Sequence, residues 1–485
     1  MTHSTDPLWT SEEAIKATGG TSVGQWQAEG VSIDSRSIEP GDLFVAIIGP
    51  SNDGHQYVEN GFKMGAAAAV VDKPEFSISN LENKKLLRVE STTSGFLNLA
   101  KFARARTAAK IIAVTGSVGK TGSKEMLKMV LGEQGKTTAT AGNLNNHWGL
   151  PLSLVRMPKE TEFGVFEMGM NHSGEIIPLT KVARPHVALI TTVEQAHSEH
   201  FKSIEDIADA KAEIFVGVEP SGTVVLNADN LMFERLFDIA KKVGIRDVRT
   251  FGFASNSDCR LVNFELGGNG SRVVIDLRGK QIKFQIGVPG FHWVKNALGV
   301  LCAVDAVGAD AEMAAEKLID MGGLKGRGRQ HVLSISGGTF IMIDESYNAS
   351  PASMKAAIEV LGDANVDGAG RKIAVLGDML ELGSQAISLH ESLVESLSEN
   401  QIDLVFTTGH YMSALSDVLP SHMRGGHATT SQKLLPMVRS VIRPGDVLTI
   451  KGSLGSKTGL IVDELLKLEC DLGRDTSLRH MAHGN

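Results

Sequence analysis

The chain has 485 residues, of which 42% are hydrophobic and 21% are charged, a composition typical of soluble globular proteins. A chain of this length exceeds what one hydrophobic core usually serves, and we expect three domains. The net charge of −8 argues against general binding to nucleic acid or to an anionic membrane, since either would require a basic surface.

Cysteine usage and the chain's apolar segments bear on where the protein is found. The three cysteines are far apart and predict neither a disulfide framework nor a cysteine metal site, so a reducing compartment fits them. The N-terminal segment lacks the basic flank and apolar core of a signal peptide. No apolar run reaches membrane-spanning length. We therefore expect a cytoplasmic protein with no membrane insertion.

Residues 1–106 are predicted to be a small α/β domain. They contain two short apolar runs, residues 43–48 and 66–71, which have the length of buried strands. Turn signals such as Asp53-Gly54 separate the two runs.

Residues 107–329 are predicted to form a central P-loop domain with a parallel sheet. Apolar strands alternate with turns and helical periods, which is the pattern of parallel strands joined by crossover helices. The stretch 255–284 alternates like antiparallel strands, and we interpret it as an added sheet. The predicted parallel strands are residues 111–114, 164–166, 187–190 and 224–226.

Residues 330–485 repeat the pattern of strand and helix and predict a Rossmann-like, doubly wound C-terminal domain. The segment 325–329, Lys-Gly-Arg-Gly-Arg, is rich in glycine and basic residues and lies between the two units, so we interpret it as a hinge. The predicted strands of the last domain are residues 340–343, 373–376, 404–406 and 447–450.

A glycine-rich loop follows the strand at 111–114 and precedes a segment with helical periodicity. Glycines let backbone N–H groups turn toward phosphates, the helix start and a lysine add positive charge, and a threonine can bind Mg²⁺. Ordinary βα turns rarely combine these features, so nucleotide binding is favoured. No guanine-selecting Asn-Lys-x-Asp sequence follows, so ATP is the expected nucleotide. The loop comprises Thr115, Gly116, Ser117, Val118, Gly119, Lys120 and Thr121.

Titratable residues follow two strands of the same predicted sheet. Glu167 ends the strand at 164–166 and His197 follows the strand at 187–190, so both lie at the edge where open α/β sheets bind ligands. Glu167 is a candidate Mg²⁺ ligand, although a glutamate at a strand end is often merely solvated. Lys211 lies on the next predicted helix, where it is either a surface lysine or part of the site.

A loop at residues 142–151 contains three asparagines, Asn143, Asn145 and Asn146. Clusters of this kind are common in plain turns. Beside an anionic site the three amides could equally bind a phosphate or a carbonyl group, so both interpretations stay open.

Taken together, these motifs resemble the ATP-binding centre of the Mur ligase family, and they occur in the same order. The similarity covers nearly the whole chain, because Asp34-Ser35-Arg36 resembles part of the family's uridine-nucleotide domain. Near the C-terminus, the run at 344–351 and the run Gly-Asp-Met-Leu-Glu-Leu-Gly at 377–383 are similar to family motifs. The second run is especially characteristic of the branch that adds D-alanyl-D-alanine.

The resemblance implies an ATP-dependent ligase that joins D-alanyl-D-alanine to UDP-N-acetylmuramoyl-tripeptide through an acyl phosphate, giving a peptidoglycan precursor. It implies ATP and Mg²⁺ as cofactors and small molecules as substrates. By the same resemblance, the first domain binds the UDP-sugar peptide, the central domain binds ATP, and the third contributes to ATP and D-Ala-D-Ala binding. We expect a monomer with no nucleic-acid partner.

Individual roles are implied residue by residue. The catalytic residues are Lys120, Asn145, His197 and Lys211, of which Lys211 matches a lysine that the family carbamylates. The nucleotide contacts beyond the loop are Asn296, Arg327, Asp344, Tyr347 and Asn348. The metal ligands are Thr121, Glu167, His197 and Lys211. The substrate contacts are Ser35, Arg36, Asn143 and Asn146.

Two other interpretations compete with this one. A sister ligase, either the one that adds the third peptide residue or a folylpolyglutamate synthase, would share the ATP centre, but the run at 377–383 argues against both. A nucleotide-binding switch or regulatory module would share the loop, but it would leave the metal-ligand set and the first domain unexplained.

Overall fold

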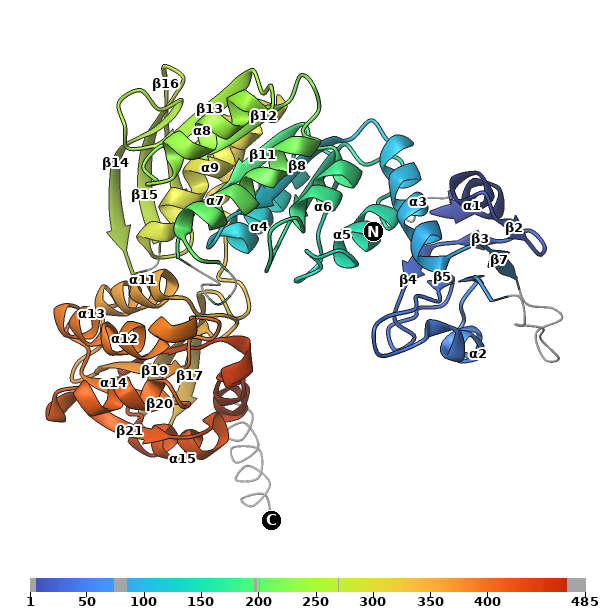
Figure 1. The fold of residues 1–485 in the computed structure, drawn as a ribbon. Helices are drawn as coiled ribbons and strands as arrows, with labels where there is room; N and C mark the ends of the chain where they lie inside the picture. Colours follow the sequence, from blue (N-terminus) through green and yellow to red (C-terminus); the bar gives the residue numbers. More distant parts are fainter. Residues whose placement is uncertain (1–5, 74–84, 196–198, 200, 269, 469–485) are drawn as a thin grey trace, which may run out of the picture.

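Three principal β-sheets follow one another along the chain, each accompanied by helices (Figure 1). The computed structural model describes residues 6–73, 85–195, 199, 201–268 and 270–468. The three α/β units that the sequence predicts are thereby confirmed. None of the helices in the described residues combines the length and the hydrophobicity that crossing a membrane requires.

The N-terminal unit contains a five-stranded sheet in the order β2-β7-β6-β5-β4, parallel except for β2. A separate antiparallel pair joins β1 and β3. The strands are β1 (Trp9–Thr10), β2 (Thr21–Ser22), β3 (Gln27–Ala28), β4 (Gly30–Ser32), β5 (Asp42–Val45), β6 (Ala68–Val71) and β7 (Leu86–Arg88). The helices are α1 (Ser11–Thr18), α2 (Val58–Lys63) and α3 (Thr92–Ala105).

The central unit contains a nine-stranded sheet in the order β16-β15-β14-β13-β12-β11-β8-β10-β9. Its strands β8–β13 are parallel, as the alternation of strand and helix predicts. The stretch interpreted as an added sheet is antiparallel, but it continues the same sheet because β13 pairs with β14. The strands are β8 (Lys110–Thr115), β9 (Thr137–Ala139), β10 (Phe163–Glu167), β11 (Val187–Ile190), β12 (Thr223–Asn227), β13 (Asp247–Gly252), β14 (Cys259–Gly267), β15 (Gly270–Leu277) and β16 (Lys280–Ile286). The α-helices are α4 (Lys120–Gly132), α5 (Gly149–Val155), α6 (Ile176–Ala183), α7 (Ile204–Ala212), α8 (Phe233–Lys242), α9 (Phe291–Val307) and α10 (Ala311–Lys317).

The C-terminal unit contains a six-stranded sheet in the order β17-β18-β22-β19-β20-β21, parallel except for β17. Its first strand begins one residue before the boundary at residue 330 that the sequence predicts. The strands are β17 (Arg329–Ile335), β18 (Gly338–Glu345), β19 (Lys372–Gly377), β20 (Leu404–Thr408), β21 (Arg424–Ala428) and β22 (Val447–Lys451). The labelled α-helices are α11 (Pro351–Gly362), α12 (Ala386–Glu391), α13 (Leu393–Glu399), α14 (Met412–Val418) and α15 (Ser431–Val441), and residues 459–468 are also helical.

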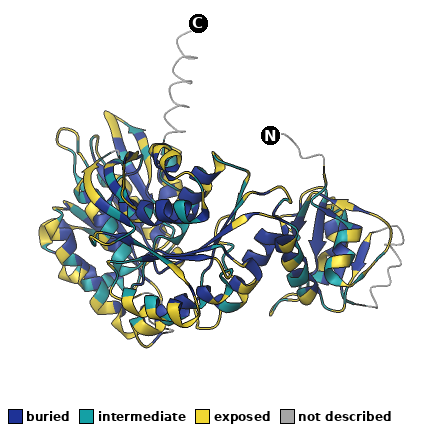
Figure 2. Ribbon diagram, turned by 90° about the horizontal axis from the view of Figure 1, so that it is seen from above, coloured by how far each residue is buried: buried dark blue, intermediate teal, exposed yellow. Residues whose placement is uncertain are grey.

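Buried apolar side chains fill both faces of the central sheet, and exposed residues lie mainly on the outer helices and loops (Figure 2). On one face, a single core continues from the central unit into the N-terminal unit, and it includes Trp9, Val31 and Leu150. The opposite face packs against α4, α9 and α10. The C-terminal sheet has two cores of its own. Parallel strands buried in this way direct their carboxyl ends to one edge, where α/β proteins bind ligands.

Candidate active site

The predicted phosphate loop connects β8 to α4 through two glycines that other residues would not replace. Gly116 and Gly119 have φ angles of 151° and 87°. A Cβ at Gly116 would lie 2.0 Å from Thr191 Oγ1, and one at Gly119 would lie 2.6 Å from Asn296 Oδ1. Both positions therefore require glycine for their backbone conformation and for the close approach of their neighbours.

The residues that follow β11 hold the loop in place. The Ser117 N–H donates to the Thr192 carbonyl at 2.8 Å, and the Ser117 hydroxyl donates to the Glu194 carbonyl at 2.9 Å. The Thr191 hydroxyl donates to the Val118 carbonyl at 2.6 Å. The loop conformation is thus fixed from a second strand of the sheet.

Lys120 is the first residue of α4, and its ammonium points back over the loop. Nζ donates to the carbonyl oxygens of Gly116 at 2.6 Å and Ser117 at 3.2 Å. Burial lowers the pKa of Lys120, and the positive charge of Arg327 adds to that effect while Glu167 opposes it. The residue from the predicted hinge is therefore close enough to influence the loop lysine.

Glu167 joins two of the other predicted residues. It ends β10, is 2% exposed, and accepts a hydrogen bond from the Thr121 hydroxyl at 2.9 Å through Oε2. Oε1 accepts from Asn145 Nδ2 at 2.7 Å. The structure thus brings Thr121, Asn145 and Glu167 together, and the alternative of a solvated glutamate is wrong.

The other two asparagines of the loop do not join this cluster. Asn143 is exposed. Asn146 Oδ1 accepts from the N–H groups of Trp148 and Gly149 at 3.1 and 2.9 Å, so it satisfies donors at the start of α5. The roles of Asn143 and Asn146 as substrate contacts stay predictions.

Lys211 lies near the end of α7 and is only 2% exposed, so the alternative of a surface lysine is wrong. Burial lowers its pKa well below the ordinary value, and the nearby charge of Lys120 lowers it further. Burial of a charged ammonium is unfavourable, so this environment favours an uncharged amine or a modified one. His197, the other candidate ligand on this side, lies outside the described residues.

Glu213 is a residue to which sequence reasoning assigned no role of its own. It follows α7, and its carboxylate accepts from Ser173 Oγ at 3.1 Å and from the N–H groups of Gly174 and Ile176 at 2.5 and 3.2 Å. These bonds connect the helix that carries Lys211 to the loop that leaves β10 after Glu167. Its position two residues after Lys211 was the only sequence signal.

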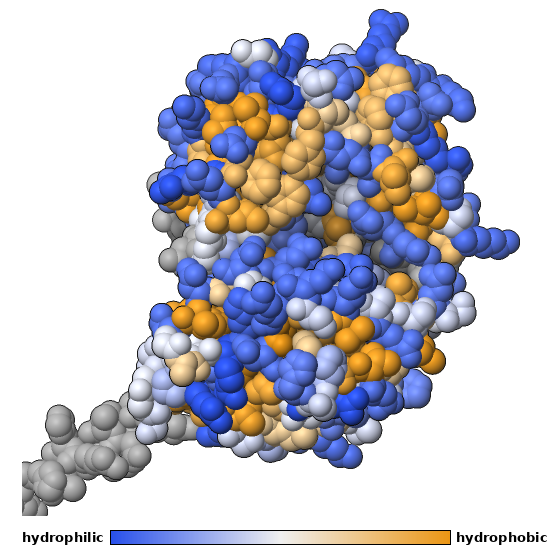
Figure 3. Space-filling model, turned by 90° about the vertical axis from the view of Figure 1, so that its left-hand side faces the viewer, coloured by the Kyte–Doolittle hydropathy of each residue, from blue (hydrophilic) through white to orange (hydrophobic). Residues whose placement is uncertain are grey.

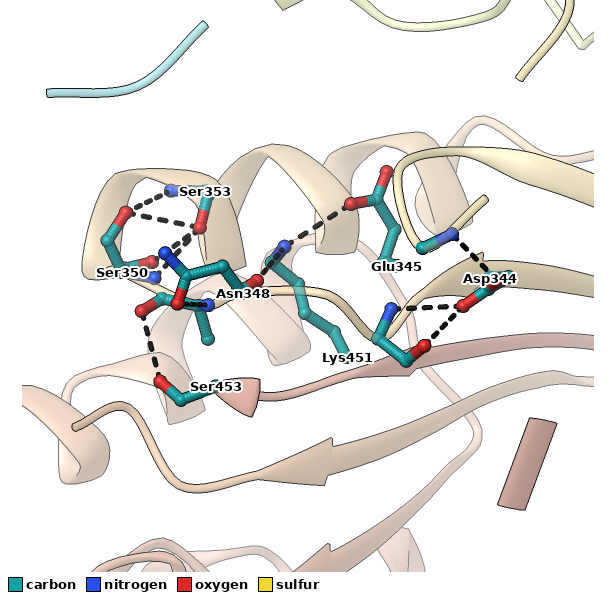
Figure 4. Close-up of polar contacts among 10 residues, drawn as sticks. Asp344, Glu345, Asn348, Ser350, Ser353, Lys451 and Ser453 are labelled. Atoms are coloured by element: carbon teal, nitrogen blue, oxygen red, sulfur yellow. Dashed lines mark hydrogen bonds and ion pairs between the residues drawn. The ribbon is translucent and has the colours of Figure 1, made fainter. Parts of the chain in front are cut away.

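The C-terminal unit contributes a second polar cluster at the ends of β18 and β22 (Figure 4). Asp344 is 2% exposed and accepts from the Gly326 N–H at 2.7 Å and the Ser346 hydroxyl at 2.6 Å. The Arg327 guanidinium lies 4.4 Å from the centre of the Tyr347 ring. The predicted residues Arg327, Asp344 and Tyr347 are therefore neighbours.

Lys451 forms the other half of this cluster, and sequence reasoning assigned it no role. Its side chain is 3% exposed, and Nζ donates to Glu345 Oε2 at 3.3 Å and to the Asn348 carbonyl at 3.0 Å (Figure 4). Burial lowers its pKa, although Glu345 opposes that effect. A lysine at the carboxyl end of a parallel strand was the signal that could have indicated it.

Trp293 and Gly328 connect the two clusters. A Cβ at Gly122 of α4 would lie 2.8 Å from the Trp293 ring, so this ring packs directly on the helix that follows the phosphate loop. A Cβ at Gly328 would lie 3.7 Å from Trp293 Nε1 and 3.4 Å from Glu345 Oε1. The central and C-terminal clusters therefore face one another across the segment 325–329.

Ser35 and Arg36 lie apart from this centre, in the turn that follows β4 of the N-terminal unit. Arg36 is exposed and pairs with Asp34, with Nη2 at 2.6 Å from Oδ2. This hydrogen bond lowers the pKa of Asp34. A role for either residue in substrate binding stays a prediction.

A surface hollow of about 320 Å³ lies elsewhere, on β14, β15 and β16. Its lining includes Phe264, Arg272 and Lys283, and none of the predicted site residues. The candidate site is therefore defined by converging polar contacts and buried charges rather than by the size of a cavity.

Family models and relatives identify the family of the chain. The chain matches the Mur ligase family catalytic domain over residues 27–106, the Mur ligase middle domain over residues 114–304, and the Mur ligase glutamate ligase domain over residues 328–454. A relative from Rickettsia prowazekii is 33% identical over 94% of this chain and 99% of its own length. The chain belongs to the Mur ligase family.

The relatives of this Mur ligase carry one activity in their names. The Rickettsia prowazekii protein and one from Bacillus subtilis, 35% identical over 90% of this chain and 93% of its own, are both named UDP-N-acetylmuramoyl-tripeptide--D-alanyl-D-alanine ligase. A crystal structure of MurF from Acinetobacter baumannii has a TM-score of 0.82 and 29% identity, covering 95% of this chain and 99% of that one. MurF from Thermotoga maritima in complex with ADP has a TM-score of 0.73 and 26% identity, covering 91% and 98%.

Proposed function

We propose that this Mur ligase uses ATP to join D-alanyl-D-alanine to UDP-N-acetylmuramoyl-tripeptide, releasing ADP and phosphate and giving the pentapeptide precursor of peptidoglycan. Two relatives that are 33 and 35% identical carry this activity in their names. The observation in the structure that supports it best is the contact of Glu167 with Thr121 and Asn145 beside the phosphate loop.

The chemistry explains why a nucleotide site is needed. A carboxylate is a poor electrophile, and amide formation is unfavourable in water. In the proposed reaction a carboxylate oxygen of the tripeptide attacks the γ-phosphorus of ATP, which forms an acyl phosphate and releases ADP. The amine of the dipeptide then attacks the acyl carbon, and the tetrahedral intermediate collapses with loss of phosphate and a proton. No side-chain nucleophile is required.

Lys120 and the loop would bind the phosphates during this transfer. The Lys120 ammonium now bonds to two loop carbonyls, and it can exchange these for γ-phosphate oxygens without moving far from the loop. Charge placed in advance around a transferring phosphoryl group is the main source of catalysis in such reactions. Arg327, with its guanidinium over Tyr347, would approach the same phosphates from the hinge segment.

The residues at the end of β10 suit Mg²⁺. The Glu167 carboxylate is buried, and its neighbours Thr121 and Asn145 are a hydroxyl and an amide rather than a cation. Carboxylate and hydroxyl oxygens are ligands that Mg²⁺ prefers. When bound, the metal would neutralise negative charge on the phosphoryl group.

Lys211 would act through a carbamate. Its lowered pKa favours the free amine, which is the form that reacts with carbon dioxide. Because the site is buried, the anion formed would need a nearby cation to compensate its charge. Carbon dioxide would add to the free amine with loss of a proton to solvent, giving an anionic carbamate whose charge a bound metal ion would compensate.

The two substrates would come from different units. The N-terminal domain, residues 1–106, would bind the UDP-sugar peptide with Ser35 and Arg36. The central domain, residues 107–329, would bind ATP. The third domain, residues 330–485, would contribute to ATP and D-Ala-D-Ala binding, and closure about the segment 325–329 would complete the site.

Replacing Lys120 tests this assignment. Lys120→Ala should reduce phosphate release by at least about a thousandfold with both substrates present, because it removes the ammonium that compensates the γ-phosphate. The assay follows ATP-dependent phosphate release with UDP-N-acetylmuramoyl-tripeptide, with and without D-Ala-D-Ala, and identifies the product by mass. Lys128→Ala, exposed on the same helix, is the matched control. Near-normal turnover of Lys120→Ala would refute the loop assignment, and a wild-type protein that binds ATP without forming the amide would refute the ligase.

A further inference from the structure

Lys124 is a fully buried lysine on α4, one helical turn after Lys120. Its side chain is 0% exposed. Nζ donates to the Thr140 carbonyl at 3.0 Å and forms an ion pair with Glu125, whose side chain is 26% exposed. A buried ammonium persists only where hydrogen bonds and an opposite charge compensate for its lost hydration. A feature this unfavourable calls for a reason beyond filling space, since an apolar side chain could fill the same volume.

Thr140 is the residue that connects Lys124 to the candidate metal site. It follows β9, an edge strand of only three residues, and is itself 2% exposed. Its N–H donates to the Val165 carbonyl at 3.0 Å, and its hydroxyl accepts from the Glu167 N–H at 3.1 Å. Thr140 therefore contacts Lys124 through its carbonyl and Glu167 through its side chain.

The chain runs from Thr140 into the loop that carries Asn145. Asn145 Nδ2 donates to Glu167 Oε1 at 2.7 Å, and the Asn145 carbonyl accepts from the Gly169 N–H at 2.9 Å. The short edge strand supplies few backbone bonds before this loop begins. The bond from Lys124 fixes the loop at its start, and the bonds of Asn145 fix it beside Glu167.

We infer that Lys124 is a positioning residue for the metal site: through Thr140 it sets where Asn145 and Glu167 lie relative to Thr121. The inference rests on the proposed function only in taking Glu167 as the metal ligand. Residues that orient metal ligands without touching the metal typically change metal affinity by about 10- to 100-fold when they are replaced. Two consecutive turns of α4 thus serve one site: Lys120 and Thr121 would bind the phosphates and the metal, and Lys124 positions Glu167 opposite Thr121 through Thr140.

Mn²⁺ affinity in the presence of ADP, measured by electron paramagnetic resonance, tests the inference without turnover. Lys124→Met keeps most of the length of the side chain and removes its donor, and it should weaken Mn²⁺ binding about tenfold. Its unfolding temperature should fall, because the substitution removes one partner of a buried ion pair and leaves the Thr140 carbonyl without its donor, so Mn²⁺ affinity is compared at a temperature where the variant is folded. Lys128→Met, exposed on the same helix, should bind Mn²⁺ like the wild type.

Two further variants separate this inference from the proposed function. Thr140→Val removes the hydroxyl that contacts Glu167 and leaves Lys124 in place, so it should reproduce the tenfold weakening even if Lys124→Met fails to fold. Glu167→Gln should weaken Mn²⁺ binding more than either. Wild-type affinity in Thr140→Val and in folded Lys124→Met, with Glu167→Gln impaired, would overturn the positioning role alone. Wild-type affinity in Glu167→Gln would instead overturn the proposed metal site.

Discussion

The two junctions of this protein are built in opposite ways. Where the N-terminal unit meets the central one, a single apolar core crosses the boundary. The Trp9 indole N–H donates to the Val155 carbonyl at 2.9 Å inside it, and Arg156 Nε donates to the Val31 carbonyl at 2.6 Å. Figure 1 shows α3 at this junction, and it packs on α5. The N-terminal unit is therefore attached as part of one folded body.

The central and C-terminal units meet through polar contacts together with a few apolar ones, such as Val360 against Gly290. Their apolar cores are separate. Gln195 Nε2 donates to Gln385 Oε1 at 3.0 Å across the junction, and the Glu199 N–H donates to the Glu381 carbonyl at 3.3 Å. On the face shown in Figure 3, hydrophobic side chains gather on the upper, central unit, and the strip where it meets the C-terminal unit is mostly hydrophilic. Polar junctions of this kind allow domains to move, because little apolar surface is exposed when they part.

The contrast assigns stability to the first junction and chemistry to the second. All the predicted nucleotide contacts lie at or beside the second junction, where Arg327 influences both the phosphate loop and the Lys451 cluster. Substitutions at the first junction should therefore lower the free energy of unfolding, and substitutions at the second should lower catalytic activity.

Trp9→Ala should have the largest effect, and it should act on stability. Trp9 is 0% exposed, and the Arg106 guanidinium lies 4.0 Å from the centre of its ring. Removing an aromatic side chain from such a core typically costs about 3 to 5 kcal/mol. Urea unfolding followed by tryptophan fluorescence and circular dichroism measures the loss.

If the first junction contributes only to stability, the Trp9→Ala variant should also keep its catalytic activity while it is folded. At temperatures below its unfolding transition, Trp9→Ala should keep a turnover number within about twofold of the wild type. Reduced stability changes the fraction of folded molecules but not the active site of those that are folded. Trp9→Phe, which keeps a ring and loses the indole hydrogen bond, should cost only about 1 kcal/mol. Turnover that falls in parallel with stability would mean that the first junction also shapes the catalytic site.

Some features of the site could be predicted from the sequence and others could not. The phosphate loop and Glu167 could be predicted, because each follows a local apolar strand, and β8 and β10 contain the predicted residues 111–114 and 164–166. Lys451 and Glu345 could not be paired from the sequence, since they lie 106 residues apart. Their contact exists because β18 and β22 are neighbours in the sheet, and no local pattern specifies which strands become neighbours.

Weakly patterned strands were missed for a related reason. The strand β21, Arg-Gly-Gly-His-Ala, has no apolar run, and it is a strand only because it pairs with β20 at the edge of its sheet. β13 is likewise defined by its neighbours β12 and β14. Buried lysines illustrate the same limit, because a sequence shows that Lys124 and Lys211 are charged but not that they are enclosed.

Arg327→Ala should act at the second junction, on catalysis. It removes a cation that lies beside Tyr347 and influences the pKa of Lys120, so it should lower kcat/KM for ATP by about 100-fold. The free energy of unfolding, measured in urea, should change by less than about 0.5 kcal/mol, since the Arg327 side chain is outside the apolar cores of both units. Arg329→Ala, exposed two residues further on, is the matched control. Unchanged kcat/KM in Arg327→Ala would reduce the segment 325–329 to a simple connection.

Lys211 combines features of both junctions, since it is buried like Trp9 and ionisable, with a pKa that its surroundings lower. Its pKa in the folded protein lies well below its ordinary value of 10.5, so between those two values the unfolded chain binds more protons. Folding stability should therefore rise with pH in that range, and the destabilising contribution is fully present below the folded pKa.

In buffer free of carbon dioxide, the stability advantage of Lys211→Met over the wild type should shrink between pH 7 and pH 9. Bicarbonate should flatten that difference and raise wild-type turnover, and short carboxylic acids should partly restore an inactive Lys211→Ala. If the difference in stability between Lys211→Met and the wild type changes with neither pH nor bicarbonate, Lys211 has only a structural role, as Trp9 does.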